Sequence, residues 1–305
     1  MDKYICQICK KEIQENKHFW KEHKIKEADY YQEYHPRYSK QTNQLIKFKN
    51  RDFYFSSDFN DKKEMMVWFK DNPELSKEYA VNLLAHRKEK KNLVYAPSHV
   101  ELRSILAPSM IWFKKNLGNY KELCERLNYQ IKFDREDDVI GYGEFPESAK
   151  IIIDTREQLP LKFNGINTEI KKLDYGDYAR FPNRYKIHVE RKNLSDFVGT
   201  LGVGYERFCR EIARAKKEGA YLIVLVEALL NNALHFNYLP HMKYSKVSPD
   251  YIFHHVREMM QTYSNLQFVF CAGRIEAAEL IKKIFCIKKH PKHYDLQYYY
   301  DTKQL

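Results

Sequence analysis

The stretch GDYARFPNRYKIHVERKNLSDF, residues 176–197, decides the interpretation of the second half of the chain. Its two strand-like runs, separated by the turn residues Pro182-Asn183, predict a β-hairpin. Side chains alternate across a strand, so Glu190 and Lys192 share one face of the second run. Asp177 lies on the neighbouring run, so the hairpin brings two carboxylates and one ammonium group towards the same place.

The surrounding elements predict an α/β fold. The apolar run 151–153 is typical of a buried strand and ends at Asp154. The elements after the hairpin alternate between helix and strand, which predicts a mixed central sheet flanked by helices. The helices are expected over 194–201, 204–219, 248–264 and 273–286, and the strands over 220–227 and 266–271.

Three carboxylates at one end of this sheet favour a metal site. Like charges in a cleft repel each other, and a hard divalent cation relieves that repulsion. Mg²⁺, or Mn²⁺ in its place, would bind carboxylates, water and phosphate oxygens and acidify a bound water. Lys192 would orient that water or neutralise charge on the phosphate. A Glu-x-Lys pair alone is commonly an exposed ion pair, so the prediction depends on Asp154, Asp177 and Glu190 together.

The same residues carry a resemblance to a known family. The pattern IIIDTRE…GD…ERK…D resembles the motif of XPF-type nucleases in the PD-(D/E)xK superfamily, over about residues 150–230 and more weakly to about 285. The resemblance implies a restriction-endonuclease-like α/β domain and Mg-dependent DNA cleavage. It implies Asp154, Asp177 and Glu190 as metal ligands and Lys192 as the catalytic lysine. The supporting residues that it implies are Arg156, Glu157, Arg191 and Asp196, the last of which would hold Arg191 or Lys192.

The chain departs from that family near its C-terminal end. XPF-type nucleases normally carry a tandem helix-hairpin-helix module that binds branched DNA and mediates dimerisation, and the sequence after Cys286 is too short for it. Targeting is therefore expected from the N-terminal half. Tyr205, Arg207 and Arg210 follow the motif and are weaker candidates for phosphate contacts. An exposed helical face explains them equally well.

The N-terminal residues have the spacing of a zinc site. Cys6-x2-Cys9 is followed by His18-x4-His23, so two thiolates and two imidazoles are available for tetrahedral Zn²⁺. The interval between the pairs is shorter than usual, and an ordinary CxxC with nearby histidines is the alternative. The segment HFWKEHKIKEADYYQEY resembles the small two-Cys two-His fingers of phage and mobile-element nucleases.

Residues 51–131 are expected to be helical and to bind DNA. Helical periodicity covers 61–92 and ends in a basic run, while short helices should begin after Ser98, Ser109 and Asn119. The three short helices resemble the helix-turn-helix-like repeats that accompany HNH-type homing endonucleases. A solvated basic face and a plain packing unit are the alternatives. The candidate DNA contacts are Arg87, Lys88, Lys90, Lys91, Lys114 and Lys115.

Composition agrees with a partner that carries negative charge. The 305 residues include 52 Lys and Arg against 41 Asp and Glu, and the net charge of +11 favours DNA. The sequence has no apolar run of membrane-spanning length and no signal-peptide pattern, so a cytoplasmic protein is expected, including one in the host cell of a phage. The expected divisions are a finger at 1–50, the helical region at 51–131, an acidic linker at 132–149, the nuclease domain at 150–286 and a tail at 287–305.

The favoured function is site-selective cleavage of duplex DNA by a homing-type or phage-encoded endonuclease. A structure-specific nuclease acting on flaps, forks or junctions is the first alternative. A non-catalytic DNA-binding protein is the second, and RNA cleavage also fits the sequence. One catalytic domain cuts one strand at a time, so a double-strand break requires a homodimer or two successive nicks.

Overall fold

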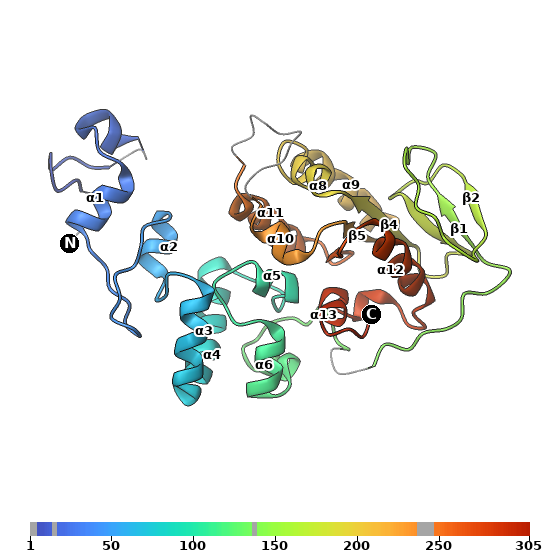
Figure 1. Ribbon diagram of the computed structural model, residues 1–305, viewed down its shortest axis with the longest axis horizontal. Coiled ribbons are helices and arrows are strands. Elements are labelled where there is room, and N and C mark those ends of the chain that lie inside the picture. The colour runs from blue at the N-terminus through green and yellow to red at the C-terminus, as the bar shows by residue number, and fades with distance from the viewer. Residues whose placement is uncertain (1–4, 14–16, 136–138, 237–246) are drawn as a thin grey trace. The chain divides into compact units, whose positions relative to one another are not determined.

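The computed structural model describes residues 5–13, 17–135, 139–236 and 247–305 (Figure 1). Its internal contacts divide the chain into two compact units, Met1–Ala80 and Val81–Leu305, here called the N-terminal and C-terminal units. Among the described residues, no helix combines the length and the apolar character that crossing a membrane requires. Each unit has a buried core of its own.

Aromatic side chains form the core of the N-terminal unit. The rings of Phe19 and Tyr30 stack with their centroids 4.1 Å apart, and Tyr31 and Tyr54 are buried in the same cluster. Aromatic pairs of this kind stabilise a core beyond the burial of their apolar area. The helical elements are η1 (Phe19–His23), α1 (Glu27–Tyr34), α2 (Arg51–Ser56) and α3 (Lys62–Asp71); α4 (Pro73–Lys91) begins in this unit and ends in the next.

Three short helices after α4 begin where their capping residues predict. Ser98 and Glu101 form a reciprocal capping box at the first, and the side chains of Ser109 and Asn119 cap the next two. These caps satisfy backbone N–H groups that the first turn of a helix leaves unpaired. The three helices are α5 (His99–Arg103), α6 (Met110–Leu117) and α7 (Tyr120–Arg126). The predicted helix starts in this region are confirmed.

The segment predicted as an acidic linker, 132–149, is anchored at its start to residues 260–263 of the same unit. The buried ammonium of Lys132 donates to the carbonyl oxygens of Met260 at 3.1 Å and Tyr263 at 2.7 Å. Burial lowers the pKa of this lysine to about 8, although the nearby carboxylates oppose the shift. Residues 136–138 lie outside the described part of the chain.

A mixed six-stranded sheet lies at the centre of the C-terminal unit, as predicted (Figure 1). The strands are β1 (Lys150–Ile153), β2 (Thr168–Ile170), β3 (Tyr178–Phe181), β4 (Ile187–Lys192), β5 (Tyr221–Val226) and β6 (Leu266–Phe270). Their order is β2-β1-β3-β4-β5-β6. The pairs β1–β3 and β3–β4 are antiparallel and the other neighbours are parallel. The antiparallel β3–β4 pair is the predicted hairpin.

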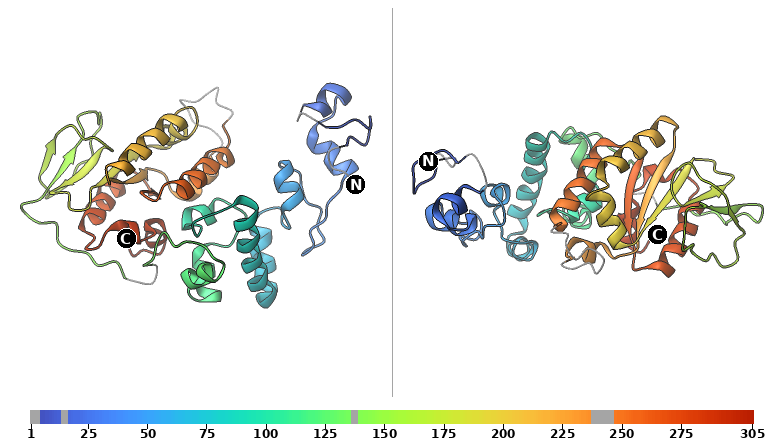
Figure 2. Two further views of the ribbon diagram at one scale, coloured as in Figure 1. Left: turned by 180° about the vertical axis from the view of Figure 1, so that it is seen from behind. Right: turned by 90° about the horizontal axis from the view of Figure 1, so that it is seen from above.

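Helices cover both faces of this sheet (Figure 2). They are α8 (Leu194–Leu201), α9 (Tyr205–Lys217), α10 (Leu230–Leu234), α11 (Pro249–Thr262) and α12 (Arg274–Cys286). The main core joins α8, α9 and α11 to alternate residues of β5, including Val224 and Val226, while α12 lies on the other face. The register pairs Glu190 with Val224 and Lys192 with Val226. Both charged side chains therefore lie on the face covered by α8 and α9.

The C-terminal segment 287–305, expected to be a tail or a docking segment, folds against the outer edge of the sheet. It contains η2 (Pro291–His293) and α13 (Leu296–Asp301). The side-chain amide of Gln297 accepts a hydrogen bond from the N–H of Phe270 at 2.6 Å and donates to its carbonyl at 3.4 Å. This amide satisfies edge-strand groups of β6 that a further strand would otherwise pair with.

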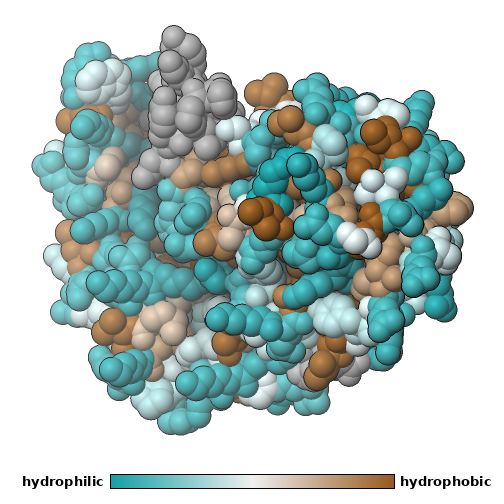
Figure 3. All heavy atoms as spheres, turned by 45° about the vertical axis from the view of Figure 1, so that its right-hand side comes forward, coloured by the Kyte–Doolittle hydropathy of each residue, from teal (hydrophilic) through white to brown (hydrophobic). Residues whose placement is uncertain are grey.

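The face of the molecule in Figure 3 is mainly hydrophilic, and its exposed apolar residues form small separate groups. Apolar side chains scattered in this way are normal on a soluble surface, whereas a large continuous patch marks an apolar interface. This face therefore offers charged and polar groups for contact with a partner.

Candidate active site and zinc site

The hairpin places Asp177 beside β4. Gly176 has a φ of +64°, and a Cβ atom there would lie 2.9 Å from the carbonyl oxygen of Val189, so only glycine fits this close approach. The N–H of Asp177 donates to the same carbonyl at 2.8 Å, and its Oδ2 accepts from the N–H of Arg191 at 2.7 Å. The carboxylate thus extends the hydrogen-bond ladder between the strands and is fixed in position.

Asp177 is held next to another carboxylate. Burial, and then the negative charge of Glu190, raise the pKa of Asp177 to about 7, although the N–H of Arg191 and the charge of Lys192 act in the opposite direction. A carboxyl group with such a pKa is ionised only in part near neutral pH. A bound cation would favour the ionised form, because it offsets the repulsion between the two carboxylates.

Glu190 and Lys192 form an ion pair within the site. The Lys192 Nζ lies 2.5 Å from Glu190 Oε1, and the two side chains are only 19% and 13% exposed. Burial lowers the pKa of Lys192, but the nearby charges of Glu190, Asp177 and Asp196 outweigh burial and raise it. Lys192 is therefore a protonated ammonium at neutral pH and acts as a cation and hydrogen-bond donor, not as a base.

Asp154 occupies a tighter environment at the end of β1. Its Oδ1 accepts hydrogen bonds from the Arg156 N–H at 2.7 Å and Nε at 2.6 Å, and its Oδ2 accepts from the Leu173 N–H at 2.6 Å. Burial raises the pKa of Asp154, but these donors outweigh it and lower the pKa overall. In the described residues, the carboxylate oxygens of Asp154, Asp177 and Glu190 do not all lie within 4.8 Å of one another. The structure brings together Asp177 and Glu190, and it engages Asp154 separately.

Arg191 points to the opposite face of β4 from Glu190 and braces the sheet. Its guanidinium donates to both carboxylate oxygens of Glu157 at 3.0 Å and to Glu227 Oε1 at 2.9 Å. All three side chains are nearly buried, with 7–12% exposed. Burial lowers the pKa of Arg191, but the two carboxylates raise it overall. Arg191 and Glu157 therefore fix the loop after β1 and support the site from the opposite face of β4.

The remaining supporting residues lie at the margin of the site. The Arg156 side chain is 64% exposed while its Nε holds Asp154, so its outer edge faces solvent. Asp196 lies in the first turn of α8, where its Oδ2 accepts from the Asn193 side chain at 2.6 Å. Its charge helps to raise the pKa of Lys192.

Two carboxylates near these residues were not predicted. Glu211 on α9 has a raised pKa because of its burial and the negative charge of Glu190, with Lys192 and Arg156 acting in the opposite direction. Glu227 directly follows β5 and binds Arg191. The position of Glu227 could have been found, because the carboxyl ends of the parallel strands β4 and β5 meet at one edge. The proximity of Glu211 to the site could not have been predicted, because it depends on how α9 packs against the sheet.

The predicted zinc ligands gather in the N-terminal unit. The donor atoms of Cys6, Cys9, His18 and His23 all lie within 4.8 Å of one another. The Cys6 Sγ is 3.4 Å from the His23 Nε2, and the Cys9 Sγ is 3.5 Å from the His18 Nε2. Tetrahedral zinc with bonds of about 2.3 Å to sulfur and about 2.0 Å to nitrogen separates such atoms by about 3.5 Å. The four residues therefore fit a zinc ion.

The basic residues expected to contact DNA have mixed environments. Lys90, Lys91 and Lys115 are exposed, whereas Arg87, Lys88 and Lys114 are half-buried. The Lys114 Nζ lies 4.6 Å from the centroid of the Tyr298 ring, and the Lys88 Nζ lies 5.6 Å from that of Tyr129. Both lysines thus pack on aromatic rings of the C-terminal unit. Their contact with DNA stays a prediction.

Comparison with known proteins gives one family match and several similar solved structures. Residues 148–284 match the family model described as the ERCC4 domain. Similar solved structures are XPF from Aeropyrum pernix (18% identity, 45% of this chain and 64% of that chain covered, TM-score 0.34) and the same protein in complex with DNA (20% identity, 45% and 62% covered, TM-score 0.33). The chain thus spans less than two thirds of either, and no curated protein matched it. The match to the ERCC4 domain model covers residues 148–284, which is a little less than half of the chain.

Proposed function

We propose that the protein is a metal-dependent DNA endonuclease whose C-terminal unit hydrolyses phosphodiester bonds. The observation that carries this proposal is the arrangement of Asp177, Glu190 and Lys192: two adjacent carboxylates beside a protonated ammonium, on one face of the sheet. Structural ion pairs also perturb pKa values, but the spacing of these residues follows the motif of the ERCC4 domain that contains them.

The residues proposed to hold Mg²⁺ or Mn²⁺ are Asp177 and Glu190, with Asp154 as a third ligand. The raised pKa of Asp177 and the hard oxygen donors fit a divalent cation. When bound, such an ion acidifies a water and polarises the phosphate. Asp154 already accepts hydrogen bonds on both oxygens, so its participation requires it to share its electron pairs with the metal or to exchange a donor.

Side chains around the carboxylates would bind and orient the phosphate of the DNA. The ammonium of Lys192 is held by Glu190 and would stabilise negative charge that develops on the phosphate. Arg156, exposed at the mouth of the site, would donate to a non-bridging phosphate oxygen. Arg191 keeps β4 and the loop after β1 in place through its two ion pairs. Glu211 would accept from the attacking water or from a metal-bound water.

A basic face on α9 supports DNA as the substrate. Arg207, Arg210, Arg214 and Lys217 are exposed, and their helical spacing places them on one side of the helix. The buried residues Phe208 and Ile212 lie on the other side, and Glu211 lies beside the site between them. A strand that contacts this face through its phosphates would pass the catalytic residues.

We further propose that the N-terminal finger binds Zn²⁺ through Cys6, Cys9, His18 and His23 and helps to select the DNA. Zinc would stabilise a small unit, since structural zinc contributes directly to folding. Site-selective cleavage of duplex DNA, by a phage or mobile-element enzyme that acts in the cytoplasm, is the finer proposal. A homodimer would allow both strands to be cut.

A structure-specific nuclease acting on flaps, forks or junctions is the second candidate. The match of residues 148–284 to the ERCC4 domain favours it, because branched DNA is the usual substrate of the XPF-type family. The two candidates share the same active site and differ in the DNA that reaches it. A comparison of cleavage rates on different DNA substrates therefore distinguishes the two candidate functions.

The test is a cleavage assay on linear duplex, flap and junction DNA of one sequence, with Mg²⁺, Mn²⁺ or a chelator. Glu190→Gln should abolish cleavage and leave DNA binding nearly unchanged, while the exposed residue Glu206 provides a control as Glu206→Gln. Equal cleavage by Glu190→Gln and the unchanged protein would refute the assigned site. Binding without cleavage of any DNA would instead favour a non-catalytic DNA-binding protein.

A further inference from the structure

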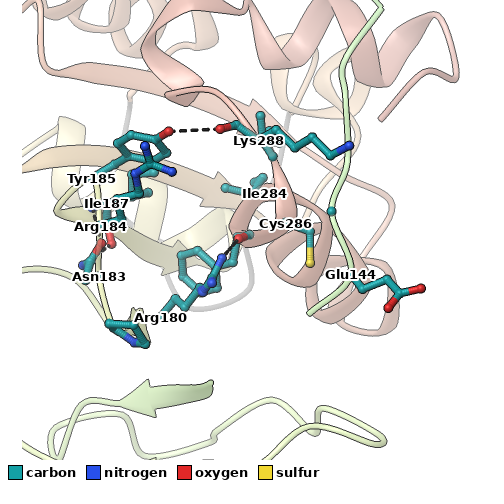
Figure 4. Close-up of a pocket in the computed structure, with 13 residues that line it drawn as sticks. Glu144, Arg180, Asn183, Arg184, Tyr185, Ile187, Ile284, Cys286 and Lys288 are labelled. Carbon is teal, nitrogen blue, oxygen red and sulfur yellow. Dashed lines mark hydrogen bonds between the residues drawn. The ribbon is translucent and has the colours of Figure 1, made fainter. Parts of the chain in front are cut away.

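A pocket with a volume of about 280 Å³ lies where β3 ends and β4 begins, next to the C-terminal end of α12 (Figure 4). The residues that form it come from the turn between the two strands, from 284–288 and from the neighbouring segment 143–144. Arg180 of the pocket lies three residues beyond Asp177, and it faces α12 while Asp177 faces α8 and α9. The pocket is therefore separate from the candidate active site.

Arg180 presents a fixed guanidinium to this pocket. Its Nη1 donates to the carbonyl oxygen of Phe285 at 2.8 Å, and its Cζ lies 5.6 Å from the centroid of the Phe145 ring. These contacts hold the planar group in one orientation. Its Nε is buried and has no hydrogen-bond partner. Unpaired buried donors are uncommon in folded proteins.

A second arginine, Arg184, also lines the pocket. Arg184 is exposed, and its Cζ lies 5.1 Å from the centroid of the Tyr185 ring. The hydroxyl of Tyr185 donates to the carbonyl oxygen of Lys288 at 3.0 Å, which fixes the ring (Figure 4). Two arginines that line one small pocket, each beside an aromatic ring, are typical of an anion site.

The charge and size of the pocket restrict the ligand. Arg180, Arg184 and Lys288 line it with Glu144 as the carboxylate, so the lining residues carry a net charge of about +2. A phosphate monoester carries about −2 at neutral pH and offers three acceptor oxygens, which suits this lining better than a single carboxylate does. Ile187 and Ile284 are nearly buried and form an apolar part of the wall (Figure 4). The volume is just below the usual range for small-molecule sites, so one small ligand would fit and a duplex would not.

We propose that this pocket binds a nucleoside monophosphate, with its phosphate between Arg180 and Arg184. The nucleotide has two sources with the same chemistry: a free mononucleotide, or the phosphorylated end of a nucleic-acid strand. The site does not depend on the proposed nuclease activity, because it lies on the other face of the sheet and uses none of the proposed metal ligands.

The experiment measures binding of dAMP to the full chain by titration calorimetry in metal-free, phosphate-free buffer. The unchanged protein should bind dAMP, and both Arg184→Gln and Arg180→Gln should weaken binding at least tenfold. Lys282→Gln removes the same charge from α12 at a residue outside the pocket and should bind as the unchanged protein does. Arg184 is exposed, so its replacement should leave the fold intact and keeps the test valid even if Arg180→Gln unfolds the protein.

Further arms distinguish the sources of the ligand. Competition against dAMP by an oligonucleotide with a terminal phosphate, but not by the same oligonucleotide with hydroxyl ends, would assign the pocket to strand ends. Binding of dAMP without such competition would assign it to free nucleotide. Equal binding by the unchanged protein and Arg184→Gln, absence of dAMP binding, or equal affinity for deoxyadenosine without phosphate would each overturn the proposal. Because no metal is present, none of these results bears on cleavage.

Discussion

Replacing Asp177 with asparagine should stabilise the metal-free protein above neutral pH. The pKa of this carboxyl rises from its ordinary value of 3.8 to about 7 in the folded protein, first because of burial and then because of Glu190. At 1.36 kcal/mol per pKa unit, that difference corresponds to about 4 kcal/mol. The folded state holds the proton more tightly than the unfolded chain does. Ionisation of Asp177 therefore costs the folded protein stability.

The pH window follows from the direction of this change. Below a pH of about 4 the carboxyl is protonated in both states and has no net effect. Stability is lost as the pH rises from about 4 to about 7, and the loss is complete above that pH. Asparagine has no such proton, so Asp177→Asn should match the unchanged protein near pH 4 and exceed it by up to about 4 kcal/mol at pH 8.

The assay is urea unfolding of both proteins at several pH values in the presence of a chelator. Asp174→Asn is the matched control, because Asp174 is an exposed carboxylate three residues earlier in the chain. Addition of Mg²⁺ at pH 8 should stabilise the unchanged protein and have little effect on Asp177→Asn, since the ion replaces the proton as the partner of this carboxylate. Parallel pH profiles for the unchanged protein and Asp177→Asn would refute the reasoning.

Three further outcomes are expected. Replacing Cys6 and Cys9 with serine should remove zinc, measured by atomic emission, and lower the melting temperature of the N-terminal unit; unchanged zinc content would refute the finger. Lys192→Met should reduce turnover by about 10²–10³ and leave metal affinity, from calorimetry, nearly the same. A loss confined to metal affinity would exclude Lys192 from the chemical step. Arg191→Met leaves two nearly buried carboxylates unpaired and should cost about 3–5 kcal/mol in urea unfolding; a change below ~1 kcal/mol would contradict its bracing role.

Local signals in the sequence predicted much of this structure. Ser98 and Glu101 form the expected capping box because a helix start depends on residues a few positions apart. The alternation of Glu190 and Lys192 with apolar residues predicted the face of β4 on which they lie. The positions of Gly176 and Asp177 were likewise predictable, because they depend only on the pairing of β3 with β4. In each case the information lies within a short stretch of chain.

Features that depend on packing between distant segments were not predicted. The strand β2 is three residues long and half exposed, so its pairing with β1 leaves no periodic pattern. The N–H of Leu173, which engages Asp154, is 19 positions away from it. Gln297 was part of a segment without period, and its role appears only when β6 is present beside it. Glu211 reaches the site through the packing of α9.

The alternation at Glu190-Arg191-Lys192 also protects the alignment of β4 with its neighbours. Sliding the strand by one position turns every side chain to the opposite face. Arg191 would then enter the carboxylate site, and Glu190 would face Glu157 and Glu227, where acid would meet acid. A one-residue shift of β4 is thus electrostatically unfavourable, because it removes the ion pairs on both faces of the strand. The tripeptide therefore admits one alignment of β4, and two of its three residues, Glu190 and Lys192, are the ones proposed for chemistry.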